Sequence, residues 1–155
     1  MADVTEDAIS NRVVQLSLFL PNRLGAMLRV HRSLGAASIR IRGITILDAA
    51  DHAVVRLIVD QPTLATEMLR TEGTSPVVSE LLAVALPGRG AIETVLTAVI
   101  AAELNIHYMY PLLAPVDGRS ILALHVESPD SAARVLLERG MTLLNQDAIG
   151  PGDLT

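Results

Sequence analysis

The chain has no cysteine and very few aromatic residues. Among its 155 residues there is no Cys and no Trp, and two Tyr and one Phe amount to 2% of the sequence. The absence of cysteine excludes disulfides, thiolate zinc sites and cysteine nucleophiles. Few side chains are left on which bases could stack, and a net charge of −5 at pH 7 supplies no basic surface. Nucleic-acid binding is therefore not expected.

Long apolar runs are also missing. Half of the residues are hydrophobic, which is ample for a core, but no run reaches the roughly 18 residues expected of a membrane span. The acidic segment from Met1 to Asp7 is not followed by the apolar stretch of a secretory signal. We expect a soluble globular protein in the cytoplasm, with no membrane partner.

Sequence features of the first half of the chain recur in the second half. Leu20-Pro21 recurs as Leu86-Pro87, Ile39 as Ile106, and Pro62 as Pro129, at a nearly constant separation. Such a separation indicates two copies of one supersecondary unit, and two copies are too few for a solenoid.

Local patterns predict the same elements in each copy. In the first copy, Ile39 to Arg42 alternates as a half-buried strand does, and a shift of parity at Gly43 predicts a β-bulge. Asp48 to Asp51 is a plausible hairpin connection. The expected elements are strands over 13–20, 39–47, 52–60 and 76–86 with helices over 26–34 and 62–72, then helices over 91–103 and 129–139 with strands over 105–113, 120–127 and 141–148.

Each copy therefore has the order βαββαβ. That order predicts an α+β protein of two ferredoxin-like units in tandem, each an antiparallel sheet with both helices on one face. We place the units at residues 11–80 and 81–148, with tails at 1–10 and 149–155.

Several segments together resemble tandem ACT-domain proteins. They are QLSLFLPNRLGAMLRV and ASIRIRGITILDAADHAVVRLIVDQPTLATEML in the first copy, and LAVALPGRGAIETVLTAVIAAELNIHYMY in the second. The resemblance implies non-catalytic regulatory domains that bind small effectors, most often amino acids, at interfaces between paired ACT units. The residues that it implies as ligand contacts are Asn22, Arg23, Leu24, Gly25, Ser38 and Ile39 in the first copy, and Gly88, Arg89, Gly90, Asn105 and Ile106 in the second.

The chemistry of such a loop can be argued without the family. A glycine-bearing loop that leads into a helix N-terminus presents free backbone N–H groups and the positive end of the helix dipole, which favour a carboxylate. Asn22 and Asn105 each offer a donor and an acceptor, as a zwitterion requires. The alternative interpretation is that such loops are ordinary turns that bind no ligand. Because Ser38 stands where many family members have Asn, and the two loops differ, we do not expect two equal sites.

No other group of side chains in the sequence indicates a catalytic or metal-binding site. His107 and His125 can approach each other on neighbouring strands, but no third metal ligand has matching spacing. Tyr108 and Tyr110 share a strand face, which favours packing. We expect no catalytic residue, no metal and no cofactor. Three arginines, Arg40, Arg42 and Arg56, are expected on the sheet face opposite the helices, solvated or paired with acidic residues.

Three functional hypotheses follow. The leading one is a stand-alone regulatory protein that binds an amino acid and forms a homodimer, because one side of the helix over 91–102 carries only small uncharged residues: Thr94, Thr97, Ala98 and Ala101. The alternative is a regulatory subunit of a separate catalytic chain, similar to the small subunit of acetolactate synthase. The third, a small enzyme resembling acylphosphatase, fits the loop from Asn22 to Gly25 poorly.

Overall fold

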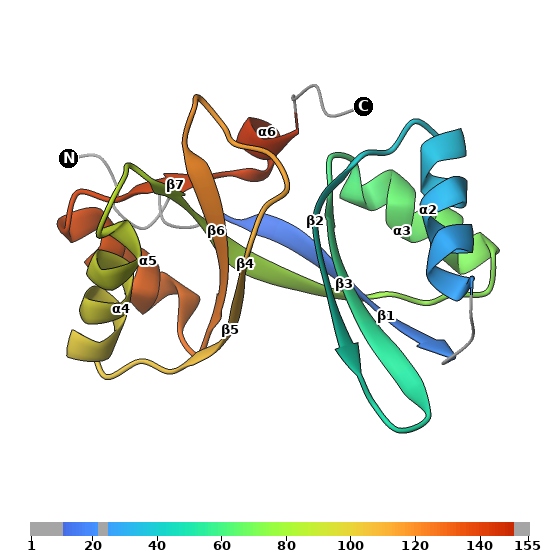
Figure 1. Ribbon diagram of the computed structural model, residues 1–155, viewed down its shortest axis with the longest axis horizontal. Coiled ribbons are helices and arrows are strands. Elements are labelled where there is room, and N and C mark those ends of the chain that lie inside the picture. The colour runs from blue at the N-terminus through green and yellow to red at the C-terminus, as the bar shows by residue number, and fades with distance from the viewer. Residues whose placement is uncertain (1–10, 22–24, 151–155) are drawn as a thin grey trace. The chain divides into compact units, whose positions relative to one another are not determined.

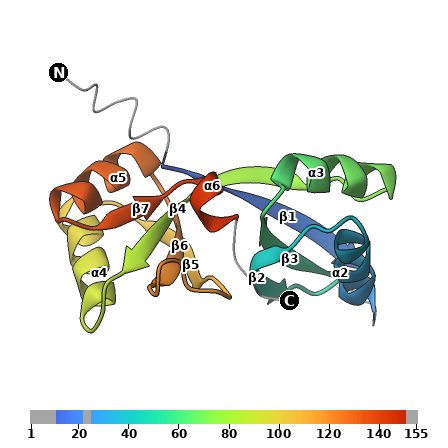
Figure 2. The same cartoon turned by 90° about the horizontal axis from the view of Figure 1, so that it is seen from above.

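The structure is a computed structural model that describes residues 11–21 and 25–150. The chain divides into two compact units: residues 14–79, the first unit, and residues 80–150 together with residues 11–13, the second unit. Each unit is a βαββαβ arrangement with an antiparallel sheet (Figures 1 and 2), which confirms the predicted pair of ferredoxin-like α+β units. Within the described residues no helix is long and apolar enough to cross a membrane.

The first unit contains three strands, two helices and the start of a fourth strand, and only Val13, the first residue of the first strand, falls outside it. These are β1 (Val13–Pro21), α2 (Ala26–Ala36), β2 (Ile41–Asp48), β3 (His52–Val59), α3 (Pro62–Thr71) and the first residues of β4 (Val77–Leu86). The strand order is β2-β3-β1-β4. Both helices cover the same face of this sheet (Figure 1).

The second unit repeats this arrangement with one addition. It consists of the rest of β4, then α4 (Ala91–Ala101), β5 (Ile106–Pro111), β6 (Ser120–Val126), α5 (Pro129–Glu138), β7 (Thr142–Leu144) and α6 (Gln146–Ile149). The strand order is β7-β4-β6-β5, and the short helix α6 follows the last strand.

Alternation along the strands builds the core of the first unit. Leu16 and Leu18 on β1 pair with Leu57 and Val55 on β3, and all four are at most 1% exposed. The α2 residue Leu34 packs into the same cluster and is fully buried. Because successive side chains of a strand point to opposite faces, these residues together line the face that the helices cover.

The predicted bulge is present in β2. The register between β2 and β3 shifts between Ile41 and Gly43, so that Arg42 is the extra residue. Ala49 N donates to His52 O at 2.9 Å in the hairpin turn that follows, as the turn residues predict. Arg42 is only 3% exposed, so the expectation of a solvated position is wrong for this residue.

Two further expectations are wrong. The predicted closing strand over 141–148 is limited to β7, because Asn145 begins α6 instead, with its side-chain oxygen accepting a hydrogen bond from Ala148 N at 2.9 Å. Ala98 does not lie on the outer side of α4, since it is 1% exposed and belongs to the core of the second unit. Thr97 and Ala101 are exposed as predicted.

Candidate functional site

The loop between β1 and α2 ends at a glycine with a left-handed backbone. Asn22, Arg23 and Leu24 lie outside the described residues. Gly25 has a φ of 89° and stands at the N-cap of α2, where no side chain caps the helix. Gly90 repeats the geometry at the N-cap of α4 with a φ of 81°. Residues with a Cβ rarely adopt this conformation, so both loops need glycine to enter the helix in this way.

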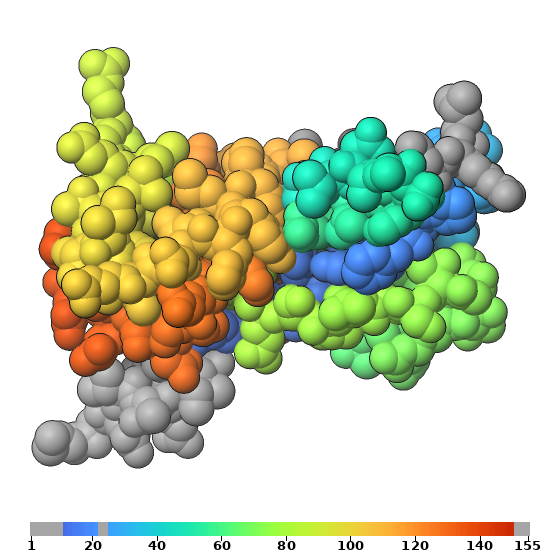
Figure 3. Space-filling view, turned by 90° about the horizontal axis from the view of Figure 1, so that it is seen from below, coloured from blue at the N-terminus to red at the C-terminus, as the bar shows by residue number. Residues whose placement is uncertain are grey.

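The corresponding loop of the second unit is exposed. Gly88, Arg89 and Gly90 are all accessible to solvent, and the loop projects from the surface of its unit (Figure 3, yellow-green). The Arg89 side chain makes no ion pair with any residue that the structure describes. The loop thus presents a cation and a helix N-terminus to solvent.

Ser38 and Ile39 lie at the other end of α2 from Gly25. The helix has 11 residues, and at about 1.5 Å of rise per residue its ends are roughly 16 Å apart. Ile39 is 3% exposed and part of the core. Within the first unit, a small ligand therefore contacts either the loop at Gly25 or the segment at Ser38, and not both.

Backbone hydrogen bonds correct the predicted equivalence of the two copies. Ile39 N donates to the helix carbonyl of Leu34 at 2.9 Å, and Leu104 N makes the same bond to Val99 O at 3.1 Å. Ile39 therefore corresponds to Leu104 and not to Ile106. Ser38 corresponds to Glu103, and both have positive φ, 58° and 56°.

By the same equivalence, Asn105 corresponds to Arg40. The backbone N–H of each donates to an acidic side chain: Arg40 to Asp60 Oδ1 at 2.9 Å, and Asn105 to Glu127 Oε2 at 3.3 Å. The Asn105 amide also donates to Glu127 Oε2, at 2.9 Å. Asn105 thus ties the start of β5 to the end of β6, while Ile106 is half-buried on β5.

One cavity of the first unit lies beside the loop glycine. It has a volume of about 330 Å³. Arg29 and Glu72 contribute charged groups of opposite sign, and the Arg29 Nη1 atom lies 3.7 Å from where a Cβ on Gly25 would stand. The other described residues that line it are Leu20, Pro21, Ala26, Val30, Ser33 and Thr74.

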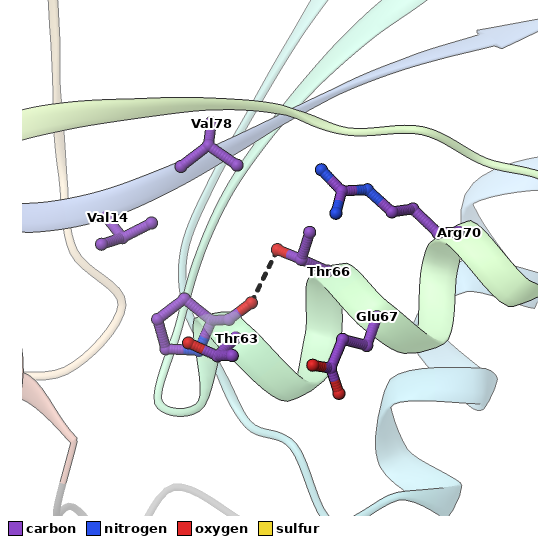
Figure 4. A pocket seen from close by; sticks show the side chains of 7 residues that line it. Val14, Thr63, Thr66, Glu67, Arg70 and Val78 are labelled. Atoms are coloured by element: carbon purple, nitrogen blue, oxygen red, sulfur yellow. Dashed lines mark hydrogen bonds between the residues drawn. The ribbon is translucent and has the colours of Figure 1, made fainter.

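A second cavity of about 290 Å³ lies along α3, where Val14 and Val78 form the wall on the strand side (Figure 4). The Thr66 hydroxyl donates to Pro62 O at 2.7 Å, so it is already engaged within the helix. The Arg70 side chain extends toward the strands, whereas the Glu67 carboxylate points away from them (Figure 4). This cavity does not direct a cation and a carboxylate toward the same space.

The aromatic side chains of β5 and β6 pack on one another. Tyr108 stacks on His125 with ring centroids 4.7 Å apart and an angle of 15° between the planes, and Tyr110 is 6% exposed. The rings of His107 and His125 are 5.1 Å apart. Among the described residues no group of three His, Cys, Asp or Glu side chains is placed to hold a metal ion.

Sequence reasoning did not identify Arg29 and Glu72. A signal was nevertheless present, because a cation in the first turn of a helix and an acid at the end of one are the reverse of what helix dipoles favour. Their convergence on one cavity depends on the packing of α2 against the segment after α3, which local patterns do not show.

Comparison with known proteins identifies the family. The chain matches the ACT domain pair family over residues 11–150. No curated protein sequence matches it. The crystal structure of protein BT0572 from Bacteroides thetaiotaomicron is similar, with a TM-score of 0.82 and 24% identity over 90% of this chain and 96% of that one.

Two regulatory subunits of aspartate kinase share the fold at lower similarity. The subunit from Thermus thermophilus, in a ligand-free form, has a TM-score of 0.58 and 18% identity over 81% of this chain and 91% of that one. The subunit from Thermus flavus has a TM-score of 0.57 and 16% identity over 83% and 92%. With the family match over nearly the whole chain and two βαββαβ units in the structure, this protein belongs to the ACT domain pair family.

Proposed function

We propose that this chain is a non-catalytic regulatory protein of the cytoplasm that binds an amino acid as its effector. The observation that carries the proposal is the match of residues 11–150 to the ACT domain pair, a family of regulatory domains. The fold shared with the regulatory subunits of aspartate kinase supports it. The glycine-ended loops at Gly25 and Gly90 add helix N-termini without a side-chain cap, which suit a carboxylate.

The proposed contacts are the loop residues in both copies. Gly88, Arg89 and Gly90 are exposed, so they are accessible to a ligand in the second unit. Asn105 contributes less than the sequence suggests, because its amide is already bonded to Glu127. Ile39 can contribute only its backbone, since its side chain is in the core.

A thermal-shift screen of the twenty standard amino acids tests this function. An effector present at 100 times its dissociation constant stabilises the native protein by about 2.7 kcal/mol. We expect at least one amino acid to raise the melting temperature in a concentration-dependent way, with isothermal titration calorimetry confirming direct binding. If none of the twenty binds at millimolar concentration, the proposed function is wrong.

A second candidate is a regulatory subunit of a separate enzyme of amino-acid metabolism. The likeness to aspartate kinase regulatory subunits, and to a structure of aspartokinase alpha and beta subunits with a TM-score of 0.56, supports this candidate. The small subunit of acetolactate synthase is one protein of this kind. The test is affinity purification from the native host, followed by enzyme assays with and without this chain. A catalytic chain whose inhibition by an amino acid requires this protein would establish the role.

The proposal includes a homodimer that forms through α4. Ile92 and Ile100 are 47% and 69% exposed on this helix, and Thr97 and Ala101 beside them are small enough to allow close approach. In the first unit, α2 carries Met27 and Gly35 at the positions of these isoleucines, so the fold itself does not require them. One acidic residue, Glu93, is exposed on the same side, at the end of this surface near the start of the helix. An exposed surface with two isoleucines usually packs on a partner.

Sedimentation equilibrium tests the dimer. Ile100→Glu is expected to shift the mass from dimer to monomer, because it places a charge in this surface. Leu28→Glu is the matched control, since Leu28 is a similarly exposed apolar residue (48%) on α2, the helix of the first unit that corresponds to α4. A wild-type monomer at all concentrations, or a dimer that Ile100→Glu leaves intact, would contradict an interface at α4.

A further inference from the structure

The geometry points to the cavity beside Arg29 and Glu72 as a binding site for the zwitterion of a free amino acid. Arg29 would hold the α-carboxylate, Glu72 the α-ammonium group, and the apolar wall the side chain. This inference rests on the proposed function, in that it takes the effector to be an amino acid. It adds a location inside a single unit, and charged residues that the family resemblance does not name.

The cavity contains the chemistry that a zwitterion needs. Its volume of about 330 Å³ is at the small end of ligand pockets, which suits a small molecule. The side chains of Arg29 and Glu72 make no hydrogen bond or ion pair with any residue in the described part of the chain. The hydroxyls of Ser33 and Thr74 add groups that both donate and accept. An arginine fork matches a carboxylate in two parallel hydrogen bonds.

Apolar side chains form the remaining wall. Leu20, Ala26 and Val30 line the cavity and are buried in the first unit. A ligand side chain placed there is removed from water, and this favours aliphatic amino acids over charged ones.

Both charges oppose the helices that carry them. Arg29 lies at the first turn of α2, where its backbone N–H donates to Gly25 O at 2.9 Å. That turn contains no acidic residue. Glu72 is the C-cap residue of α3. The positive end of a helix disfavours a cation and the negative end disfavours an anion. Neither residue is placed where it stabilises its own helix, whereas a bound zwitterion would supply the counter-charge for each.

The second unit shows the same positions without these groups. Thr94 replaces Arg29, with the equivalent bond from its N–H to Gly90 O at 3.1 Å. Arg139 replaces Glu72 as the C-cap of α5, where the helix dipole favours a cation. The second unit therefore keeps the fold with the opposite charge at the helix end.

The polar residues that line the cavity are replaced by buried apolar residues in the second unit. Thr74 N donates to Leu69 O at 2.8 Å, and Met141 N makes the matching bond to Leu136 O at 3.0 Å, so Met141 takes the place of Thr74. Met141 is 7% exposed and belongs to the core of its unit. Ala98, buried at 1%, takes the place of Ser33. The fold thus does not require the cavity, and the first unit alone has the charged residues to use it.

Calorimetry on the full chain tests the site. Each of the twenty amino acids is titrated into the wild type, and an aliphatic one is expected to bind. Arg29→Gln and Glu72→Gln are each expected to weaken that binding about 10- to 100-fold, the loss of a hydrogen bond to a charged group. Arg32→Gln, an exposed arginine on the same helix, and Glu138→Gln, an exposed acid at the end of α5, are the controls and should bind as the wild type does.

Ligand analogues assign each charge to its partner. The amide of the bound amino acid lacks the carboxylate, and its N-acetyl derivative lacks the ammonium group. In Arg29→Gln the amide should bind as well as the amino acid does, because the carboxylate has already lost its partner. In Glu72→Gln the N-acetyl derivative should bind as well as the amino acid does, because the ammonium group has already lost its partner. Additive losses in both variants would overturn the assignment.

Two negative results remain distinct. If an amino acid binds the wild type and both variants equally, this cavity is not the site, while the proposed regulatory function stands. If no amino acid binds the wild type, the site and the proposed function both fail. Circular dichroism of each variant shows whether it is folded, since both substituted residues are exposed and neither change should affect the fold.

Discussion

Substitution by alanine should change the stability of the first unit in opposite directions at Gly25, the N-cap of α2, and at Gly35 within this helix. Gly25 has a φ of 89°, whereas Gly35 lies within the helix and has no positive φ. Among the residues that the structure describes, a Cβ on Gly35 would meet no atom within 4 Å, and on Gly25 it would meet only Arg29 Nη1 at an ordinary 3.7 Å. Space is therefore available at both positions, and backbone conformation alone decides the outcome.

The magnitudes follow from that difference. Alanine at Gly35 gains about 0.8–1.0 kcal/mol of helix propensity. Alanine at Gly25 costs roughly 1–2 kcal/mol for the left-handed backbone, of which about 0.4–1 kcal/mol is offset because the unfolded chain loses freedom. We therefore expect Gly35→Ala to stabilise and Gly25→Ala to destabilise the first unit, with a difference of about 2 kcal/mol between them.

Urea unfolding monitored by circular dichroism measures this difference. With a slope of about 2 kcal/mol per molar urea, the two midpoints should lie about 1 M apart on either side of the wild type. The two variants have the same composition, so each controls for the other. The reasoning is refuted if Gly25→Ala is as stable as Gly35→Ala, because the loop would then not require a left-handed residue.

Three further substitutions, one of them with a matched control, test other parts of the structure. Leu34→Ala should cost about 2–5 kcal/mol in urea unfolding because Leu34 is fully buried, whereas Leu28→Ala, 48% exposed on the same helix, should stay within about 0.5 kcal/mol. Asn105→Ala should cost about 0.5–1.5 kcal/mol through its lost bond to Glu127 and leave amino-acid affinity unchanged; a loss of affinity without loss of stability would restore its predicted role as a ligand contact. Thr74→Met should remove amino-acid binding in calorimetry while leaving the chain folded, and unchanged binding would show that the cavity is not used.

Local sequence signals were sufficient for most of the fold. The bulge at Gly43 was predictable because a parity shift at a glycine is a property of one strand, and the turn from Asp48 to Asp51 because its residues favour turns. The family assignment also followed from the sequence, since the loop and strand motifs occur in order over nearly the whole chain.

Longer-range features were not predictable in the same way. The β-strand-to-helix loop is one residue shorter in the second copy, and its β5–β6 hairpin is two residues longer than the β2–β3 hairpin of the first. Because the two changes have opposite signs, the number of residues between equivalent positions of the two copies stays nearly constant along the chain. This near-constant separation led to the false pairing of Ile39 with Ile106. The burial of Arg42 was missed because burial depends on tertiary packing, which a strand's own alternation does not reveal.

The candidate site was predicted only in part. The loop that ends at Gly25 stays a predicted ligand contact, and the proposed cavity lies directly beside it. Arg29 and Glu72 were missed because they are 43 residues apart in the printed sequence and meet only through the packing of α2 against the end of α3. A search for charges that oppose their helix dipoles would have found both.

The comparison of the two units suggests why only the first keeps this arrangement. A charge that opposes a helix end costs typically about 0.3–1 kcal/mol, so Arg29 and Glu72 together cost the first unit about 0.6–2 kcal/mol. The second unit avoids that cost with Thr94 and Arg139, and it has the buried Met141 at the position of Thr74. An effector at 100 times its dissociation constant would stabilise the first unit by about 2.7 kcal/mol.

Because of the cost of these two charges, the ligand-free protein should open more readily in the first unit. Hydrogen exchange should show the protection of α2 and α3 rising when the effector is added, while the protection of α4 and α5 changes little. Equal gains in both units would mean that the effector does not act through this cavity.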